Sequence, residues 1–79
     1  MMRTTIDLHG LTHEESLIKV EEFLLLNSFD NYLDLELITG KSELLQKKII
    51  NNILKKYDFQ YFTPNYNTGV IFVSNKKLN

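Results

Sequence analysis

Four short runs of apolar and β-branched residues lie along the chain, bounded by glycine, asparagine and other turn-forming residues. Runs of this length and composition predict β-strands, here at residues 4–8, 33–38, 59–63 and 69–73. In the second run, leucines alternate with Asp34 and Glu36, which is the period of a half-exposed strand and suggests a place near a sheet edge. The Asn-rich segment 64–68 joins the last two runs and predicts a hairpin.

Two longer segments carry apolar residues at helical spacing. Thr12 and Glu15 have the spacing of a capping box, so they predict a helix that begins after Thr12 and runs to about Asn27, before a polar turn. The residues expected in its buried stripe are Leu17, Val20, Phe23 and Leu24. Ser42 is the expected cap of a second helix, whose apolar positions recur every four residues. These positions are Leu45, Ile49, Ile53 and Tyr57, joined by Ile50 and Leu54.

The element order β-α-β-α-β-β predicts a single two-layer α/β (α+β) domain. Each β-α-β step is expected to be a right-handed crossover that gives parallel strands, and the hairpin adds an antiparallel strand. We therefore expect a four-stranded mixed sheet with two helices on one face. The domain should span residues 1–79, with a core from about 4 to 73 and a polar tail at 74–79. Core residues are expected to include Leu17, Val20, Leu24, Ile49, Ile53 and Ile71.

Composition limits the class of protein. The 79 residues suffice for one domain, and the absence of cysteine excludes disulfides and thiolate metal sites. No apolar run approaches the roughly 20 residues of a membrane span, and the N-terminus lacks the apolar region of a signal peptide. We expect a cytoplasmic protein with no membrane partner, and we favour a monomer.

Charge is unevenly distributed along the chain. The net charge of −1 argues against a generic polycation that coats nucleic acid. Residues 1–40 nevertheless sum to −6, whereas residues 41–79 sum to +5. This asymmetry indicates either a basic patch on one face or two solvated helix faces of opposite sign, and the second interpretation is the simpler.

The first candidate for chemistry is Ile6-Asp7-Leu8-His9-Gly10, at the expected C-terminal end of the first strand. Ligands of open α/β sheets gather beyond the carboxyl ends of parallel strands. Asp7 and His9 are two apart on a strand, so their side chains should point the same way. The carboxylate could then orient an imidazole that transfers a proton near neutral pH. An isolated D-x-H is more often a solvated aspartate followed by a turn histidine.

The second candidate is Ile38-Thr39-Gly40-Lys41-Ser42. A strand, a glycine turn and a helix start aim backbone amides at phosphate oxygens, and Lys41 adds a positive charge. A P-loop NTPase is rejected because the motif needs a glycine where Leu35 stands. A structural turn capped by Ser42 explains the segment equally well. If the two strands are parallel neighbours, both motifs fall on one sheet edge and together suit a phosphodiester.

These two motifs resemble those of the Smr (small MutS-related) domain family. That family carries L-D-x-H-G on its first strand and T-G-x-G or H-G-x-G after its second. Here they appear as Ile6-Asp7-Leu8-His9-Gly10, followed by Leu11-Thr12 and Glu14-Glu15, and as Thr39-Gly40-Lys41-Ser42. The similarity extends from about Thr4 to Val73. It implies a fold like that of the C-terminal domain of bacterial translation initiation factor three.

The resemblance also implies binding or nicking of DNA or RNA. The catalytic groups would be Asp7 and His9, and the turn that contacts the backbone would be Thr39, Gly40 and Lys41. The chain departs from the family where Ser42 replaces the second glycine, and again where Glu43 enters the helix without the usual glycine-rich loop. These departures favour a binding module over a nuclease.

Three hypotheses for function follow. The first is a domain that binds DNA or RNA phosphates through the residues Thr39, Gly40, Lys41, Ser42, Lys47 and Lys48, with Lys55 as a further contact. The second is an endonuclease that nicks DNA or cleaves RNA, in which Asp7 positions His9 for proton transfer. The third is a protein-interaction domain, for which the candidate anchors are Phe29, Phe62 and Tyr66.

No metal site is predicted. A divalent cation such as Mg²⁺ or Mn²⁺ could join through Asp7, but one carboxylate is thin support for a site built from protein ligands. His9 and His13 are separated by a turn and do not share a helix face, which argues against zinc.

Overall fold

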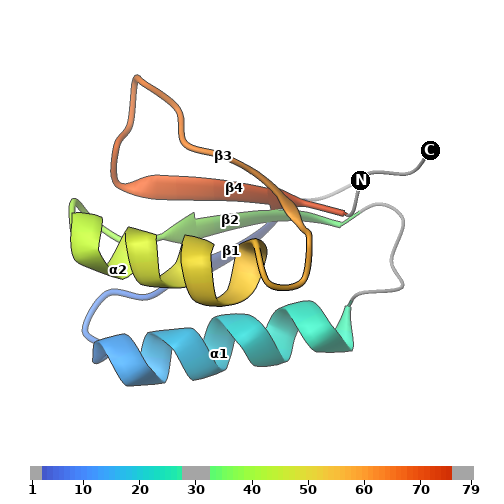
Figure 1. Cartoon of the computed structure of the whole chain (residues 1–79). Coiled ribbons are helices and arrows are strands. Elements are labelled where there is room, and N and C mark those ends of the chain that lie inside the picture. The colour runs from blue at the N-terminus through green and yellow to red at the C-terminus, as the bar shows by residue number, and fades with distance from the viewer. Residues whose placement is uncertain (1–2, 28–32, 76–79) are drawn as a thin grey trace.

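Four strands form one sheet in the order β1-β2-β4-β3, and two helices cover one of its faces (Figure 1). The computed structural model describes residues 3–27 and 33–75. The strands are β1 (Thr4–Asp7), β2 (Asp34–Ile38), β3 (Gln60–Phe62) and β4 (Val70–Ser74). The helices are α1 (His13–Leu26) and α2 (Glu43–Ile49), which continues as a π-helical turn, η1 (Ile50–Leu54). The predicted β-α-β-α-β-β fold is confirmed.

Strand β4 lies between β2 and β3. β1 and β2 are parallel, with Asp7 opposite Ile38, and β4 runs antiparallel to both β2 and β3. β2 is therefore an interior strand, and its expected place near a sheet edge is wrong. Its polar residues Asp34 and Glu36 are partly exposed because both helices lie on the opposite face of the sheet.

Several boundaries differ from those predicted. β1 ends at Asp7, although the next residue, Leu8, is buried. β4 includes Ser74, which the sequence assigned to the polar tail. The predicted turn at 28–31, Phe29 within it and the tail residues 76–79 lie outside the described residues.

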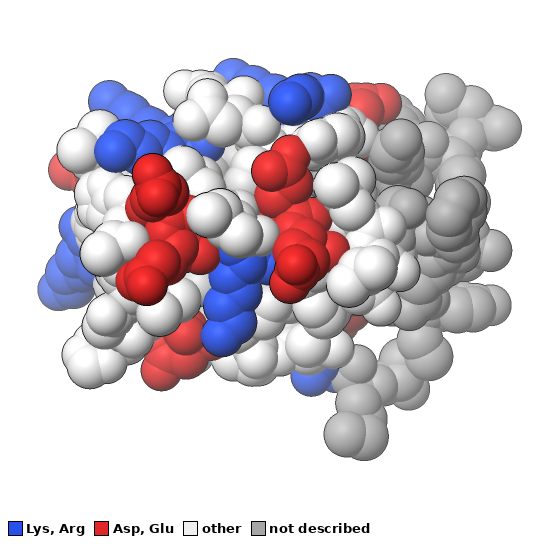
Figure 2. All heavy atoms as spheres, turned by 90° about the horizontal axis from the view of Figure 1, so that it is seen from below, with Lys and Arg blue, Asp and Glu red and all other residues white. Residues whose placement is uncertain are grey.

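The predicted capping box begins α1. Glu15 donates its amide to the Thr12 hydroxyl at 3.0 Å, and the Glu15 carboxylate accepts from the Thr12 amide at 2.9 Å. The buried stripe is centred on Ser16, Val20 and Leu24, four residues apart. Leu17 is half-buried and packs against the core cluster from beside this stripe, so its expected full burial in the core is not met. Figure 2 shows the outer side of the helix, where carboxylates lie on both sides of a basic side chain.

The second helix does not continue as a regular α-helix to Tyr57, as its four-residue repeat predicted. The Lys55 amide donates to the Ile50 carbonyl at 2.8 Å, a five-residue step that widens the last turn. Ile53 and Leu54 are both buried in this wider turn. Asp58, at φ +62°, then takes the left-handed conformation that ends the helical segment.

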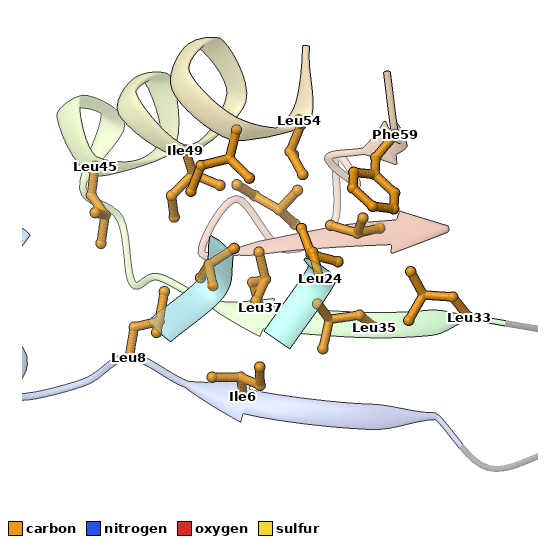
Figure 3. Packing of buried hydrophobic residues seen from close by; sticks show 14 residues of the cluster. Ile6, Leu8, Leu24, Leu33, Leu35, Leu37, Leu45, Ile49, Leu54 and Phe59 are labelled. Carbon is orange, nitrogen blue, oxygen red and sulfur yellow. The ribbon is translucent and has the colours of Figure 1, made fainter. Parts of the chain in front are cut away.

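The core lies between the sheet and the two helices. Figure 3 shows leucine and isoleucine side chains from the strands and from the helices meeting in this space. The predicted members Ile49, Ile53 and Ile71 are each at most 2% exposed. No helix among residues 3–27 and 33–75 is both long enough and apolar enough to cross a membrane.

Replacement of Ile53 by alanine tests the packing of the π-helical turn. We expect Ile53→Ala to lower the free energy of unfolding by about 2–5 kcal/mol, because it leaves a cavity under η1. Leu44 on α2 is 58% exposed, so the control Leu44→Ala should change stability by no more than about 0.5 kcal/mol. Urea unfolding followed by circular dichroism measures both. Equal losses of unfolding free energy in Ile53→Ala and Leu44→Ala would show that η1 is packed differently.

The Tyr57 hydroxyl joins the end of η1 to α1. It donates to the Glu21 carboxylate at 2.5 Å, and this bond, together with partial burial and the charge of Glu21, raises the pKa of Tyr57 above its ordinary value. A raised folded-state pKa gives stability that is complete below the unfolded-state pKa of about 10 and is lost as the pH rises through the folded-state value.

Comparison of the wild type with Tyr57→Phe isolates this contribution. We expect the wild type to have the higher melting temperature at pH 8, and the difference to shrink above about pH 10 as the phenol ionises beside Glu21. Thermal unfolding at pH 8, 9, 10 and 11 measures it. A difference that is constant over this range would contradict the assignment.

Candidate nucleic-acid interface

Three connections meet at the end of the sheet where β1 and β2 terminate (Figure 1). They are the β1–α1 connection (8–12), the β2–α2 turn (39–42) and the β3–β4 connection (63–69). The Leu8 amide donates to the Ile38 carbonyl at 3.0 Å and joins the first two. The Thr39 amide donates to the Gly69 carbonyl at 2.9 Å and joins the second to the third. Residues far apart in the sequence are thereby brought to one edge.

Asp7 and His9 are both exposed at this edge. The Asp7 carboxylate accepts a hydrogen bond from the backbone amide of His9 at 2.9 Å. Although the regular strand ends at Asp7, burial still alternates beyond it, with Leu8 buried and His9 exposed. Gly10 follows with φ +82°, a left-handed conformation that suits glycine. The carboxylate therefore stabilises the turn that carries His9, rather than contacting the imidazole.

The β2–α2 turn is held by the β3–β4 connection. The amides of Thr39 and Gly40 both donate to the Gly69 carbonyl, at 2.9 and 3.1 Å. Gly40 has φ +68°, which again suits glycine. These two amides are satisfied within the protein, so they are not available to a phosphate at this turn.

Gln46 links the turn to the β3–β4 connection. Its side-chain amide donates to the Thr39 hydroxyl at 2.9 Å and to the Thr68 carbonyl at 2.7 Å. Beside it lies an open groove of about 420 Å³. The groove is lined by Lys41, Glu43, Gln46, Thr63, Pro64, Asn65 and Thr68. Of these, only Lys41 was predicted as a site residue.

The groove residues that sequence reasoning missed come from two distant segments. Gln46 has the appearance of an ordinary polar helix residue, and the Asn-rich segment 64–68 predicted only a hairpin. Their meeting depends on β4 pairing with β2, which no local motif encodes. The polar content of the hairpin connection was the one available signal.

The remaining predicted residues have different surroundings. The Ser42 hydroxyl accepts from the Leu45 amide at 3.2 Å, so it caps α2 as expected. Lys47 is exposed on the outer side of α2. Lys48 is half-buried, and its ammonium lies 3.3 Å from Nδ1 of His13, at the start of α1. The structure thus places Lys41 at the groove and directs Lys48 towards α1.

Metal-binding side chains are not clustered at this edge. Within the described ranges, 3–27 and 33–75, no group of three or more histidine, aspartate and glutamate side chains is arranged to hold a metal ion. Neither Asp7 nor His9 is part of such a group.

The family of the chain follows from comparison with known proteins. The family model of the Smr domain matches residues 6–74, which include both motifs and the closing hairpin. No curated protein and no solved structure matches the chain. Because the family match covers nearly all of the 79 residues, this protein belongs to the Smr domain family.

Proposed function

We propose that this domain binds DNA or RNA through its phosphates at the edge where the three connections meet. The observation that carries the proposal is the position of Lys41, which lines the 420 Å³ groove together with residues of α2 and of the β3–β4 connection. Smr domains are generally nucleic-acid binding or nuclease-like, which supports this assignment. Phosphate contacts of this kind position a nucleic acid without reading its sequence.

The distribution of charge favours an approach from the side of α2. Five lysines lie on α2, on η1 or beside them, and four of these are exposed. They are Lys41, Lys47, Lys48, Lys55 and Lys56. Figure 2 views the molecule from the side of α1, where acidic side chains face the reader. Basic side chains gather along the upper border of this view, towards α2. A polyanion would therefore be attracted to α2 and repelled by the outer side of α1.

The polar lining of the groove suits phosphate and sugar groups. Thr63, Asn65 and Thr68 offer neutral hydrogen-bonding groups opposite Lys41. Gln46 already donates to Thr39 and Thr68, so its role would be to hold the wall of the groove in place. Glu43 lines the same groove and would repel a phosphate placed near it. Of the two charged residues in the lining, only Lys41 would attract a phosphate.

Cleavage of a phosphodiester is the second candidate function. The observation that favours it is the exposure of His9 at the same edge, on a turn that the Asp7 carboxylate holds through the His9 amide. His9 would transfer the proton between the nucleophile or leaving group and solvent, while Lys41 would offset charge on the phosphate. Asp7 would position His9 through the turn, and its negative charge would stabilise the positive charge that the imidazole gains during the reaction.

The binding proposal predicts a shallow dependence on salt. With few phosphate contacts, the slope of log K against log salt should be about −2 to −4, and Lys41→Ala should weaken binding and make the slope less negative by about 1. Fluorescence anisotropy with single-stranded and duplex DNA and RNA, at several salt concentrations, measures both. Lys19, an exposed lysine of α1, supplies the matched control Lys19→Ala. Binding that ignores salt, or equal effects of the two variants, would refute this interface.

The cleavage proposal predicts that His9→Ala slows the reaction about a hundredfold or more while leaving affinity nearly unchanged. Asp7→Asn keeps an oxygen that can accept from the His9 amide, so it removes the charge with little change to the turn. It should slow cleavage and slightly tighten binding. Supercoiled plasmid and a structured RNA, each with Mg²⁺ or Mn²⁺, are suitable substrates.

Controls separate this activity from contamination. His13 lies at the start of α1, and His13→Ala should retain the cleavage rate of the wild type. If wild type and His9→Ala nick the plasmid equally, the assignment of His9 is wrong. If neither exceeds a mock preparation, the domain binds without cleaving.

A further inference from the structure

The face of the sheet opposite the helices carries an ordered row of side chains. The register places Thr5, Glu36, Phe72 and Phe62 opposite one another on β1, β2, β4 and β3. The Thr5 hydroxyl donates to Glu36 at 3.3 Å, and the two phenylalanine rings stack with centroids 6.4 Å apart. Phe62 is 60% exposed, so an apolar ring at the end of this row is open to solvent.

A shallow hollow of about 160 Å³ opens on this face. The residues that line it include Asp34, Gln60, Phe62 and Phe72. The volume is that of a single large side chain rather than of a drug-sized ligand. An acidic group next to two aromatic rings is chemically suited to a flat cation.

Arg3 shows how this face holds such a cation. Its Nε donates to Oδ1 of Asp34 at 3.0 Å, and its guanidinium carbon lies 4.4 Å from the centroid of the Phe72 ring. The side chains of this ion pair are 47% and 43% exposed, so the contact is weak and can be exchanged. The free protein thus already combines a guanidinium, a carboxylate and a phenylalanine ring here.

We propose that the hollow binds an arginine side chain from a basic segment of another protein. The incoming guanidinium would stack on Phe62 and pair with Asp34, as Arg3 does with Phe72 and Asp34. Arginine fits better than lysine because its planar group can stack and donate two parallel hydrogen bonds. This surface does not include the lysines or groove residues of the proposed nucleic-acid interface.

Charge complementarity selects the partner. Among Arg3 and the charged residues that the described strands place on this face, three are acidic and one is basic. They are Asp7, Asp34, Glu36 and Arg3. Carboxylates repel a polynucleotide and attract a basic peptide, so the aromatic pair is not a platform for bases.

The test uses the whole chain and three capped peptides of sequence Gly-X-Gly-X-Gly, where X is arginine, lysine or citrulline. Citrulline keeps the shape of arginine and lacks its charge. We expect the arginine peptide to shift the ring signals of Phe62 and Phe72 saturably in two-dimensional NMR, and the lysine peptide to bind about threefold or more weaker. Equal binding of the citrulline peptide, or no shift with any peptide, would overturn the proposal.

Substitutions assign the contact to this face. Phe62→Ala and Asp34→Asn should each weaken binding of the arginine peptide by about threefold or more, and Phe62→Leu, which keeps apolar cover, should also weaken it. Tyr66 is 82% exposed in the β3–β4 connection and supplies the control Tyr66→Ala, which should bind as wild type does. Unchanged affinity in all three test variants would refute the site.

Two cross-checks keep this result separate from nucleic-acid binding. Lys41→Ala should leave peptide affinity unchanged, and Phe62→Ala should leave affinity for a single-stranded oligonucleotide unchanged. Loss of oligonucleotide affinity in Phe62→Ala would show that the sheet face binds bases, and the arginine proposal would then be wrong.

Discussion

The antiparallel pairing of β4 with β2 is the interaction on which both the core and the candidate interface depend. It places Ile71 and Val73 against the helices, opposite Leu37 and Leu35. It also brings the β3–β4 connection to the edge where β1 and β2 end. There the Gly69 carbonyl accepts two amides of the β2–α2 turn. The same pairing therefore completes the hydrophobic layer and forms one wall of the groove.

Local sequence signals predicted local structure well. The capping pair of Thr12 and Glu15, and the cap at Ser42, act within three residues, so their chemistry is visible in the sequence. Apolar spacing likewise identified the buried positions Val20, Ile49 and Ile53. The π-helical turn was missed because both an α-helix and a wider turn can bury Ile53, and only the packing of Leu54 beside it separates them.

Long-range pairing accounts for the remaining differences. The alternation in β2 indicated one exposed face, and such a pattern is shared by an edge strand and by an interior strand of a sheet covered on one side. Whether Gln46 meets Thr68 depends on strand order, which periodicity does not encode. The order of the motifs along β1 and β2 did predict a shared edge, because adjacent parallel strands end on the same side. What the residues at that edge do to a ligand stays a prediction.

Geometry at the two motifs distinguishes what binding and cleavage would each require. Binding needs positive charge that a phosphate can reach, and Lys41 supplies it in the groove, on a turn that the Thr39 and Gly40 amides hold in place through Gly69. Cleavage needs more, because His9 must also come within hydrogen-bond reach of the oxygen whose proton it takes or gives. Here the Asp7 carboxylate accepts from the His9 amide, so it orients the imidazole only through the turn. An enzyme using this edge would therefore depend on the bound substrate to bring the imidazole within reach of that oxygen. Simple binding of a phosphate does not require this alignment.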